Sequence, residues 1–240
     1  MLDLYFWPTP NGYKVSILLE ELGLDYNVIP VHIGKGEQFK PEFLAISPNN
    51  KIPALVDHDG PGGKPYSLFE SAAIMLYLCE KTNSALMPSE TRARHDVMQW
   101  LMFQVGGVGP MLGQAHHFRK YAPEQIQYAV DRYTNEATRL YKVIDRRLQD
   151  ARFLGGDTYS LADIATYPWL RPYKWQGQEL ADYPNLQRWY EEVRAREGVQ
   201  RGLAVLGEKI DRSGAKPSGE RWDNLFGKGQ LGNNEKETQR

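Results

Sequence analysis

Apolar positions in the first third of the chain alternate between the spacing of strands and that of helices. Four short apolar runs have the pattern of strands and lie at residues 2–7, 26–33, 52–56 and 66–69. Three stretches between them have helical spacing and lie at residues 11–22, 41–45 and 71–81. Pro30 has no amide proton for a strand ladder, so the second run is expected at a sheet edge. This part of the chain is therefore predicted to be a mixed α/β domain.

After residue 83 the spacing of apolar residues becomes helical throughout. Helices are predicted over residues 90–105, 124–148, 186–196 and 199–210. The glycine-rich run at residues 106–110 is expected to bend or interrupt the first of them. Ser160 and Asp163 have the spacing of a capping box, in which each side chain accepts a backbone N–H of the same first turn. A second, all-helical domain follows from this pattern.

The change of pattern divides the chain into three parts. We predict the mixed α/β domain over residues 1–84, the all-helical domain over residues 88–210 and a polar tail over residues 211–240. The tail is rich in glycine and charge, which predicts mobility. Its large apolar residues from Trp222 to Phe226 offer the alternative that the tail docks on the rest of the protein.

Composition and charge restrict the partners of the chain. The 240 residues are 41% hydrophobic and 25% charged, and the net charge of −1 gives no long-range attraction to nucleic acid or anionic membrane. The longest apolar run, at residues 72–79, is too short to span a bilayer, and Met1 leads directly into a strand without a basic leader. A single cysteine allows no intramolecular disulfide. We expect a cytoplasmic protein that binds neither nucleic acid nor membrane.

Two predicted helix starts carry polar residues suited to anions. Backbone N–H groups at a helix start lack partners and lie at the positive end of the helix dipole. Asn11 is a candidate N-cap of the first helix, and Ser71 follows Glu70 at the start of the helix over residues 71–81. Each residue serves either as an ordinary cap or as part of an anion site, and the local sequence leaves both interpretations open.

A third candidate is the segment that enters the strand at residues 52–56, where Pro53 removes one ladder donor. A cis Ile52–Pro53 bond would turn the Ile52 backbone outward and leave its N–H and C=O to an extended peptide. The local sequence alone does not establish a cis bond, because most X–Pro bonds are trans.

Taken together and in this order, the motifs resemble those of the cytosolic glutathione transferases. The resemblance runs from residue 2 to about residue 205 and rests on Ser47-Pro48 before Ile52-Pro53-Ala54-Leu55, on Leu68-Phe69-Glu70-Ser71 before an apolar helix, and on the capping box. Four stretches are similar in particular to the Nu class and to fungal proteins related to the yeast nitrogen regulator, namely "PTPNG", "ISPNNKIPA", "LFESAAIMLYL" and "QVGGVGPMLGQAHHF".

This resemblance implies a fold and an assembly. It implies an α/β thioredoxin-like N-terminal domain followed by an all-α C-terminal domain, the glutathione transferase fold, paired as a homodimer. The co-substrate would be glutathione, with no metal. Arg132 matches an arginine that reaches the site from the helical domain of the partner subunit.

The resemblance also implies a set of glutathione contacts. The bond before Pro53 would be cis, with the backbone of Ile52 pairing with the cysteinyl part of glutathione. Glu70 and Ser71 would receive the γ-glutamyl end. Gln38 would help to bind the glycyl end or the neighbouring backbone. Lys51 is adjacent to the site.

The turn at the start of the first helix is suited to holding a thiolate. An unperturbed cysteine thiol has a pKa of about 8.5, so a transferase must stabilise the thiolate of glutathione with donors and positive potential. Thr9 offers a hydroxyl, and Asn11 offers side-chain and backbone N–H groups, in a turn that Pro8 and Pro10 restrict. Tyr5 is the alternative donor, because several transferase classes use a tyrosine near the end of the first strand.

The sequence contains no Cys-x-x-Cys pair, and Cys79 lies in an apolar helix. A thiol–disulfide cycle would therefore need two glutathione thiols. The resemblance implies a glutathione-dependent disulfide-bond reductase or glutathione transferase that acts on a small disulfide or electrophile, with Thr9 and Asn11 as catalytic residues. The alternatives are conjugation or peroxide reduction with Tyr5 as the donor, and a glutathione-binding regulatory module without turnover.

Three further features lie near the expected cleft: a histidine pair, a glycine-rich run and four aromatic residues. His116 and His117 are adjacent and point apart on a helix, so we predict no metal site there. The glycines of "VGGVGPMLG" are expected to open space for a second glutathione or a substrate. Four aromatic residues either line the cleft or pack in the core, namely Trp7, Trp169, Tyr173 and Trp175.

Overall fold

The N-terminal part of the chain forms a four-stranded sheet. The structure is a computed structural model, and it describes residues 1–209 and 216–231. The strands are β1 (Leu2–Phe6), β2 (Tyr26–Pro30), β3 (Ala54–Asp57) and β4 (Tyr66–Phe69), in the order β2-β1-β3-β4. β1 runs parallel to β2 and antiparallel to β3, and β3 runs antiparallel to β4. β2 lies at an edge of the sheet and ends at Pro30, as the lack of a ladder donor predicts.

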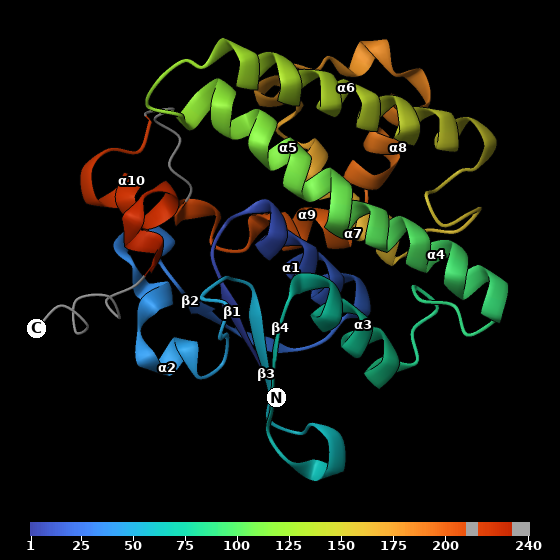
Figure 1. Cartoon of the computed structure of the whole chain (residues 1–240). Coiled ribbons are helices and arrows are strands. Elements are labelled where there is room, and N and C mark those ends of the chain that lie inside the picture. Colours follow the sequence, from blue (N-terminus) through green and yellow to red (C-terminus); the bar gives the residue numbers. More distant parts are fainter. Residues whose placement is uncertain (210–215, 232–240) are drawn as a thin grey trace, which may run out of the picture.

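Helices cover both faces of this sheet (Figure 1). They are α1 (Pro10–Leu22), η1 (Ile33–Lys35), η2 (Glu37–Phe39), α2 (Pro41–Leu44) and α3 (Ser71–Thr82), whereas η3 (Pro61–Gly63) lies in the projecting turn between β3 and β4. α1 and α3 pack together on the face that buries Leu4 and Phe6. α2 lies on the opposite face, where Phe43 packs with Val31 and Ala54 in a small apolar cluster. The predicted order of strands and helices is confirmed, except that β2 stops before residue 33, where the chain turns into η1.

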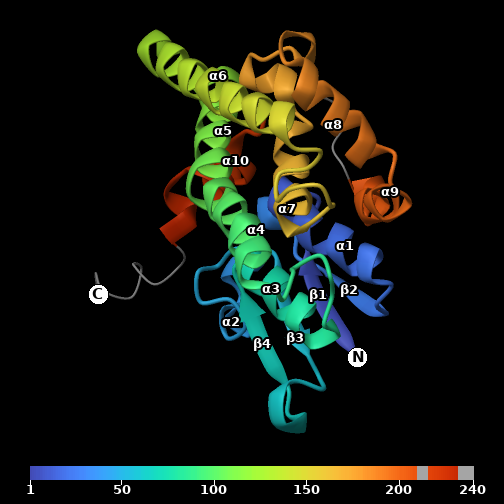
Figure 2. The ribbon, with the colours of Figure 1, turned by 90° about the vertical axis from the view of Figure 1, so that its right-hand side faces the viewer.

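The second part of the chain is helical, as predicted, and stands above the sheet in Figure 1. Its elements are α4 (Thr91–Phe103), η4 (Gln104–Val108), α5 (Gly109–His116), η5 (His117–Tyr121), α6 (Gln127–Asp150), α7 (Leu161–Leu170), η6 (Tyr173–Gln176), η7 (Leu180–Asp182), α8 (Pro184–Arg194), α9 (Glu197–Ala204) and η8 (Gly207–Lys209). The interruption expected at residues 106–110 takes the form of a wide π-helical turn, η4, after which the helix continues as α5 (Figure 2). No helix of the described residues is long and apolar enough to cross a membrane.

The buried helix α7 joins the two parts of the protein. Every residue of α7 except Trp169 is buried, and the helix packs on both α4 and α1. The predicted capping box is present, because the backbone N–H of Ser160 donates to Asp163 Oδ2 at 3.0 Å. Burial raises the pKa of Asp163 to about 6. α1 therefore packs on both parts of the protein, against α3 of the sheet domain and against α7 of the helical domain.

The described part of the C-terminal segment folds back onto the sheet domain. α10 (Gly219–Phe226) lies beside η1 and is followed by η9 (Lys228–Leu231) (Figure 1). Asn224 Nδ2 donates to the carbonyl of Gly34 at 3.3 Å, and the ring of Phe226 packs on those of His117 and Tyr121. Residues 219–226 therefore dock on the rest of the protein, which is the alternative to a mobile tail. The rest of the predicted tail includes residues 211–215 and 232–240, which lie outside the described residues.

Candidate active site

Thr9, rather than Asn11, is the N-cap of α1. Thr9 has extended backbone angles (φ −136°, ψ 160°), and its Oγ1 accepts a hydrogen bond from the backbone N–H of Gly12 at 3.2 Å. Pro10 then occupies the first helical position, where a missing N–H costs nothing. Asn11 already lies inside the first turn, so the prediction that it caps the helix is wrong.

This cap leaves three hydrogen-bond donors at the helix start. Pro10 has no N–H, Gly12 N–H binds Thr9 Oγ1, and the N–H of Tyr13 binds the carbonyl of Thr9 at 2.9 Å. The Asn11 N–H has no partner among the described residues, and neither has Asn11 Nδ2. The hydroxyl of Thr9 accepts with one lone pair and keeps its own hydrogen for donation. Capping and donation to a ligand are therefore compatible at Thr9.

The other side of the Asn11 carboxamide is bound by the helical domain. Trp169, the one residue of α7 that is not buried, donates its indole Nε1–H to Asn11 Oδ1 at 2.9 Å. The sequence predicts Trp169 as either a wall of the cleft or a core residue. Its hydrogen bond to the turn was not predicted.

The Ile52–Pro53 bond is cis, as the resemblance implies. β3 begins one residue later, and neither the N–H nor the C=O of Ile52 forms a hydrogen bond with a described residue. The loop before it is fixed by Ser47, whose Oγ donates to the carbonyl of Lys51 at 2.8 Å. The backbone of Ile52 is thus available to an extended peptide.

The start of α3, unlike that of α1, has no side-chain cap. Glu70 stands at the N-cap with a positive φ of 69°, and its side chain makes no capping bond. Its carboxylate instead accepts a hydrogen bond from Asn49 Nδ2 at 3.3 Å. Ser71, only 9% exposed, begins the helix. The structure therefore brings Glu70 and Ser71 to an open, positively polarised helix end.

A buried lysine lies beneath this helix end. Lys14 is 3% exposed, and its Nζ donates to Gln104 Oε1 at 2.6 Å and to Ser71 Oγ at 3.4 Å. Burial lowers the pKa of Lys14 to about 7, against the opposing influence of the Glu70 carboxylate. Sequence reasoning missed Lys14, although its spacing of four from Leu18 places a cation on the apolar side of α1.

Gln38, expected at the glycyl end, and Lys51, expected adjacent to the site, both contact the C-terminal segment. Gln38 is buried, its Nε2 donates to the carbonyl of Asn224 at 3.5 Å, and its Oε1 has no partner among the described residues. Lys51 Nζ donates to Gln230 Oε1 at 3.1 Å, and burial lowers the pKa of Lys51. The segment after residue 216 therefore forms a wall on this side of the site, which the sequence did not indicate.

Arg132 is not brought to the other candidate residues within one chain. It is exposed on α6, which packs on α5 and α8. Figures 1 and 2 both show α6 on the side of the helical domain that faces away from the sheet. A role for Arg132 in the site depends on a second subunit.

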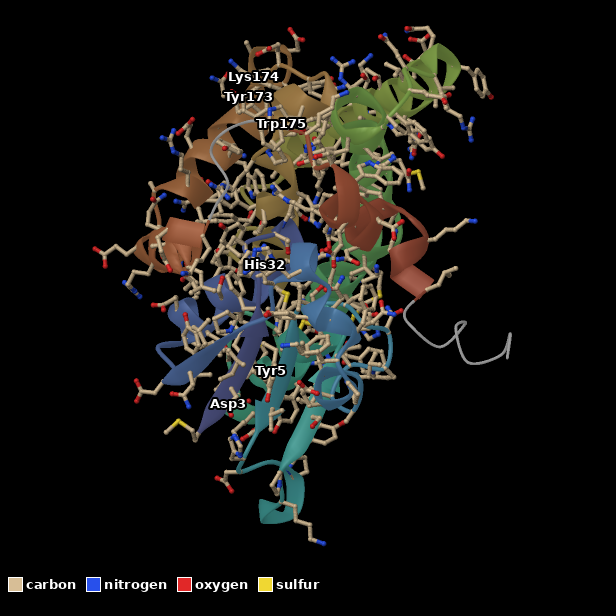
Figure 3. The ribbon with its side chains drawn as sticks, turned by 90° about the vertical axis from the view of Figure 1, so that its left-hand side faces the viewer. Asp3, Tyr5, His32, Tyr173, Lys174 and Trp175 are labelled. Atoms are coloured by element: carbon tan, nitrogen blue, oxygen red, sulfur yellow. The ribbon has the colours of Figure 1, made fainter. Side chains whose placement is uncertain are left out.

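Tyr5 lies on a different face of β1 from its buried neighbours. Leu4 and Phe6 pack with residues of α1 and α3, whereas the ring of Tyr5 packs on Phe43 of α2, with ring centroids 6.0 Å apart. Tyr5 is labelled in Figure 3 together with Asp3 of the same strand. Burial raises the pKa of Tyr5. Tyr5 thus belongs to the small cluster under α2.

The cysteine is buried, and the two adjacent histidines pack against aromatic rings. Cys79 is 2% exposed in α3, and burial raises the pKa of its thiol to about 12, so it is the buried thiol that its apolar helix predicts. His116 packs on the rings of Tyr121 and Trp175, and burial lowers its pKa to about 4. Within residues 1–209 and 216–231, no three or more His, Cys, Asp or Glu side chains gather as metal ligands.

Comparison with known proteins agrees with the fold and the motifs. The family models described as the glutathione S-transferase N-terminal and C-terminal domains match residues 1–80 and 108–197. The disulfide-bond oxidoreductase YfcG of Escherichia coli is 54% identical over 212 residues, which cover 87% of this chain and 98% of that protein.

Two solved structures share the whole arrangement. A glutathione transferase from Burkholderia graminis, with two glutathione molecules per subunit, superimposes with a TM-score of 0.81 at 45% identity and covers 85% of this chain and 88% of its own. One from Pseudomonas putida, with one glutathione disulfide per subunit, has a TM-score of 0.81 at 43% identity, with coverages of 86% and 92%. The resemblance and the fold predicted from the sequence are confirmed, and the chain belongs to the glutathione S-transferase family.

Proposed function

We propose that this protein is a glutathione-dependent disulfide-bond reductase of the Nu type in which Thr9 and Asn11, and no protein cysteine, activate the thiol of glutathione. The observation that carries the proposal is the set of unused donors at the start of α1: the Thr9 hydroxyl, the Asn11 N–H and Asn11 Nδ2. Hydrogen bonds to an ionised acceptor are roughly twice as strong as those between neutral groups. Such donors favour the thiolate over the thiol and lower the pKa of bound glutathione.

The remaining candidate residues fit the rest of glutathione. The free backbone of Ile52 suits the cysteinyl part, which is a short extended peptide. The α-carboxylate of the γ-glutamyl end suits the uncapped start of α3 at Glu70 and Ser71, with the cation of Lys14 below it. Gln38 is expected on the glycyl side, where its Nε2 donates to the carbonyl of Asn224 in the C-terminal segment.

The reaction we propose uses two glutathione molecules in succession. The first thiolate attacks one sulfur of the substrate disulfide, the S–S bond breaks, and the other sulfur leaves with the electron pair and takes a proton. A second glutathione thiolate attacks the glutathione sulfur of the mixed disulfide, which yields glutathione disulfide and a second substrate thiol. The two glutathione sulfurs together lose the two electrons that the substrate gains. Relatives crystallised with two glutathione molecules or with glutathione disulfide support this sequence.

We also propose that the protein acts as a cytoplasmic homodimer, in which Arg132 of one subunit reaches the glutathione of the other. The exposure of Arg132 on α6 supports this, because the side chain is open to a neighbouring subunit. Sedimentation analysis should give a dimer. Arg132→Ala should weaken glutathione binding and leave the dimer intact. A monomer with full glutathione affinity would contradict this part of the proposal.

The experiment that tests the reaction is the reduction of 2-hydroxyethyl disulfide by glutathione, coupled to glutathione reductase and NADPH. We expect turnover that is unchanged in Cys79→Ala and lost in Thr9→Ala with Asn11→Ala. Loss of turnover in Tyr5→Phe, with the Thr9 and Asn11 variants active, would transfer the role to Tyr5. Calorimetric binding of glutathione without turnover of any disulfide would indicate a binding module instead.

A further inference from the structure

We infer that Trp169 is a positioning residue for the thiolate site, because its indole N–H fixes the orientation of the Asn11 carboxamide. The inference rests on the proposed function, since it concerns how Asn11 meets the glutathione thiolate. Trp169 comes from α7 of the helical domain, whereas Asn11 begins α1 of the sheet domain. One hydrogen bond of 2.9 Å therefore connects the helical domain to the proposed catalytic turn.

The chemistry of the indole decides which way the carboxamide points. An indole N–H can only donate, so the atom of Asn11 that it meets is the carbonyl Oδ1. The Nδ2 group, with its two donor hydrogens, is then on the other branch of the amide. Nδ2 has no partner among the described residues and is not enclosed, so it is available to a ligand.

Without this partner the carboxamide would have two nearly equivalent orientations. The oxygen and nitrogen of an asparagine side chain are similar in size, and a half-turn about its last bond exchanges them. In the exchanged orientation the lone pairs of Oδ1 would face the thiolate and repel it. The hydrogen bond from Trp169 favours the orientation that presents donors, so none of this ordering has to occur when glutathione binds.

The surroundings of Trp169 hold its ring in place. A methyl group on Gly113 would lie 3.3 Å from the ring, and one on Gly109 would lie 3.5 Å from it. The backbone carbonyl of Trp169 accepts a hydrogen bond from Gln176 Nε2 at 2.7 Å. Gly113 therefore makes room for the indole, whereas a methyl group on Gly109 would first meet Gln104 Nε2, at 2.9 Å.

The test compares Trp169→Phe, which keeps an aromatic ring but removes the N–H, with the wild type and with Trp100→Phe. Trp100 is a matched control, because it is also partly buried in the helical domain and packs on Phe103 and Arg147 rather than on α1. The pKa of bound glutathione is measured from the ultraviolet absorbance of its thiolate. We expect Trp169→Phe to raise this pKa by about one unit, which lowers the rate of disulfide reduction below the pKa about tenfold. Trp100→Phe should leave both unchanged.

A double-mutant cycle separates positioning from simple packing. If Trp169 acts through Asn11, then Trp169→Phe should have no further effect on the thiol pKa in an Asn11→Ala background. The same further shift in both backgrounds would overturn the inference, and so would a wild-type thiol pKa in Trp169→Phe. If the wild type itself does not lower the thiol pKa, the thiolate role of Thr9 and Asn11 fails, and this inference fails with it.

Discussion

The two helix starts of the sheet domain present positive ends of different character. α1 is capped by the side chain of Thr9 and retains a few neutral donors, one of which is oriented by Trp169. α3 has no side-chain cap, begins after a residue with positive φ, and lies over the buried cation of Lys14. Neutral hydrogen-bond donors can stabilise a thiolate that must remain nucleophilic. A positive charge suits a carboxylate that only has to be bound. In the proposed function, α1 carries the chemistry and α3 the binding.

Removing the donors of α1 is the strongest test of this comparison. Thr9→Ala combined with Asn11→Ala should lower the turnover of 2-hydroxyethyl disulfide at saturating glutathione by roughly 10² to 10³, the cost of losing a donor to a developing anion. Binding of S-methylglutathione, which has no free thiol, should change little, because the carboxylate contacts remain. Isothermal titration calorimetry and the coupled assay measure the two effects.

Thr9→Ser is the matched control for the donors of α1, because serine keeps both the cap and the hydroxyl. It should retain most of the activity. A large loss of S-methylglutathione affinity in the double variant would mean that α1 also binds the peptide, and the separation of roles would fail.

At α3, Lys14→Met should weaken the binding of S-methylglutathione about tenfold and leave turnover at saturating glutathione within a few-fold of the wild type. The variant removes the cation beside Ser71 but fills the same space. The free energy of unfolding should fall by about 1–3 kcal/mol, because Gln104 Oε1 is left buried without the donor that Lys14 supplies, so binding and turnover are measured on protein whose folding is checked by thermal unfolding. Equal losses in binding and turnover would contradict a purely binding role for this end.

The pKa of Lys14 gives the same end a pH dependence. With a pKa of about 7 in the folded protein, Lys14 is charged below that pH and neutral above it. Affinity for S-methylglutathione should therefore fall several-fold between about pH 6 and pH 8. An unfolded lysine keeps its proton to much higher pH, so the free energy of unfolding should rise over the alkaline part of this range and beyond. Both trends should disappear in Lys14→Met, and an unchanged pH profile in that variant would assign them to another group.

The smallest effect is expected at Asn49, whose exposed side chain binds the Glu70 carboxylate. Asn49→Ala removes one exposed hydrogen bond, worth about 0.5–1 kcal/mol, and should weaken S-methylglutathione binding about two- to fivefold. Turnover at saturating glutathione should not change. Gln187→Ala, on the exposed side of α8, serves as a surface control. A change in turnover without a change in binding would contradict the division between the two helix ends.

The sequence predicts the fold well because its signals are local. Strand runs, helical spacing and the capping box at Ser160 each depend on neighbouring residues, and the family motifs locate Pro53 and Ser71. The cap at Thr9 was also readable, because a threonine followed by proline is typical of an N-cap and a first helical position. Asn11 is the candidate in the sequence analysis because asparagine is a common cap and it stands at the head of the helical pattern.

The rest of the site depends on contacts between distant residues. Trp169 and Asn11 are 158 residues apart in the sequence, and Asn224 and Gln38 are 186 apart. No local sequence pattern therefore predicts either hydrogen bond. The orientation of an amide and the position of a docked segment follow from tertiary packing. A buried lysine is the intermediate case, because its place on an apolar helix face is visible while its partner Gln104 is not.

The hydrogen bond between Trp169 and Asn11 also sets an order of events during synthesis. A ribosome delivers the sheet domain first, and domains generally fold as units in the order in which they emerge. The cap at Thr9 can form as soon as α1 does, but the carboxamide of Asn11 gains its partner only after α7 has been made and has packed on α1. A nascent chain can thus contain the folded sheet domain before the carboxamide of Asn11 is oriented by Trp169.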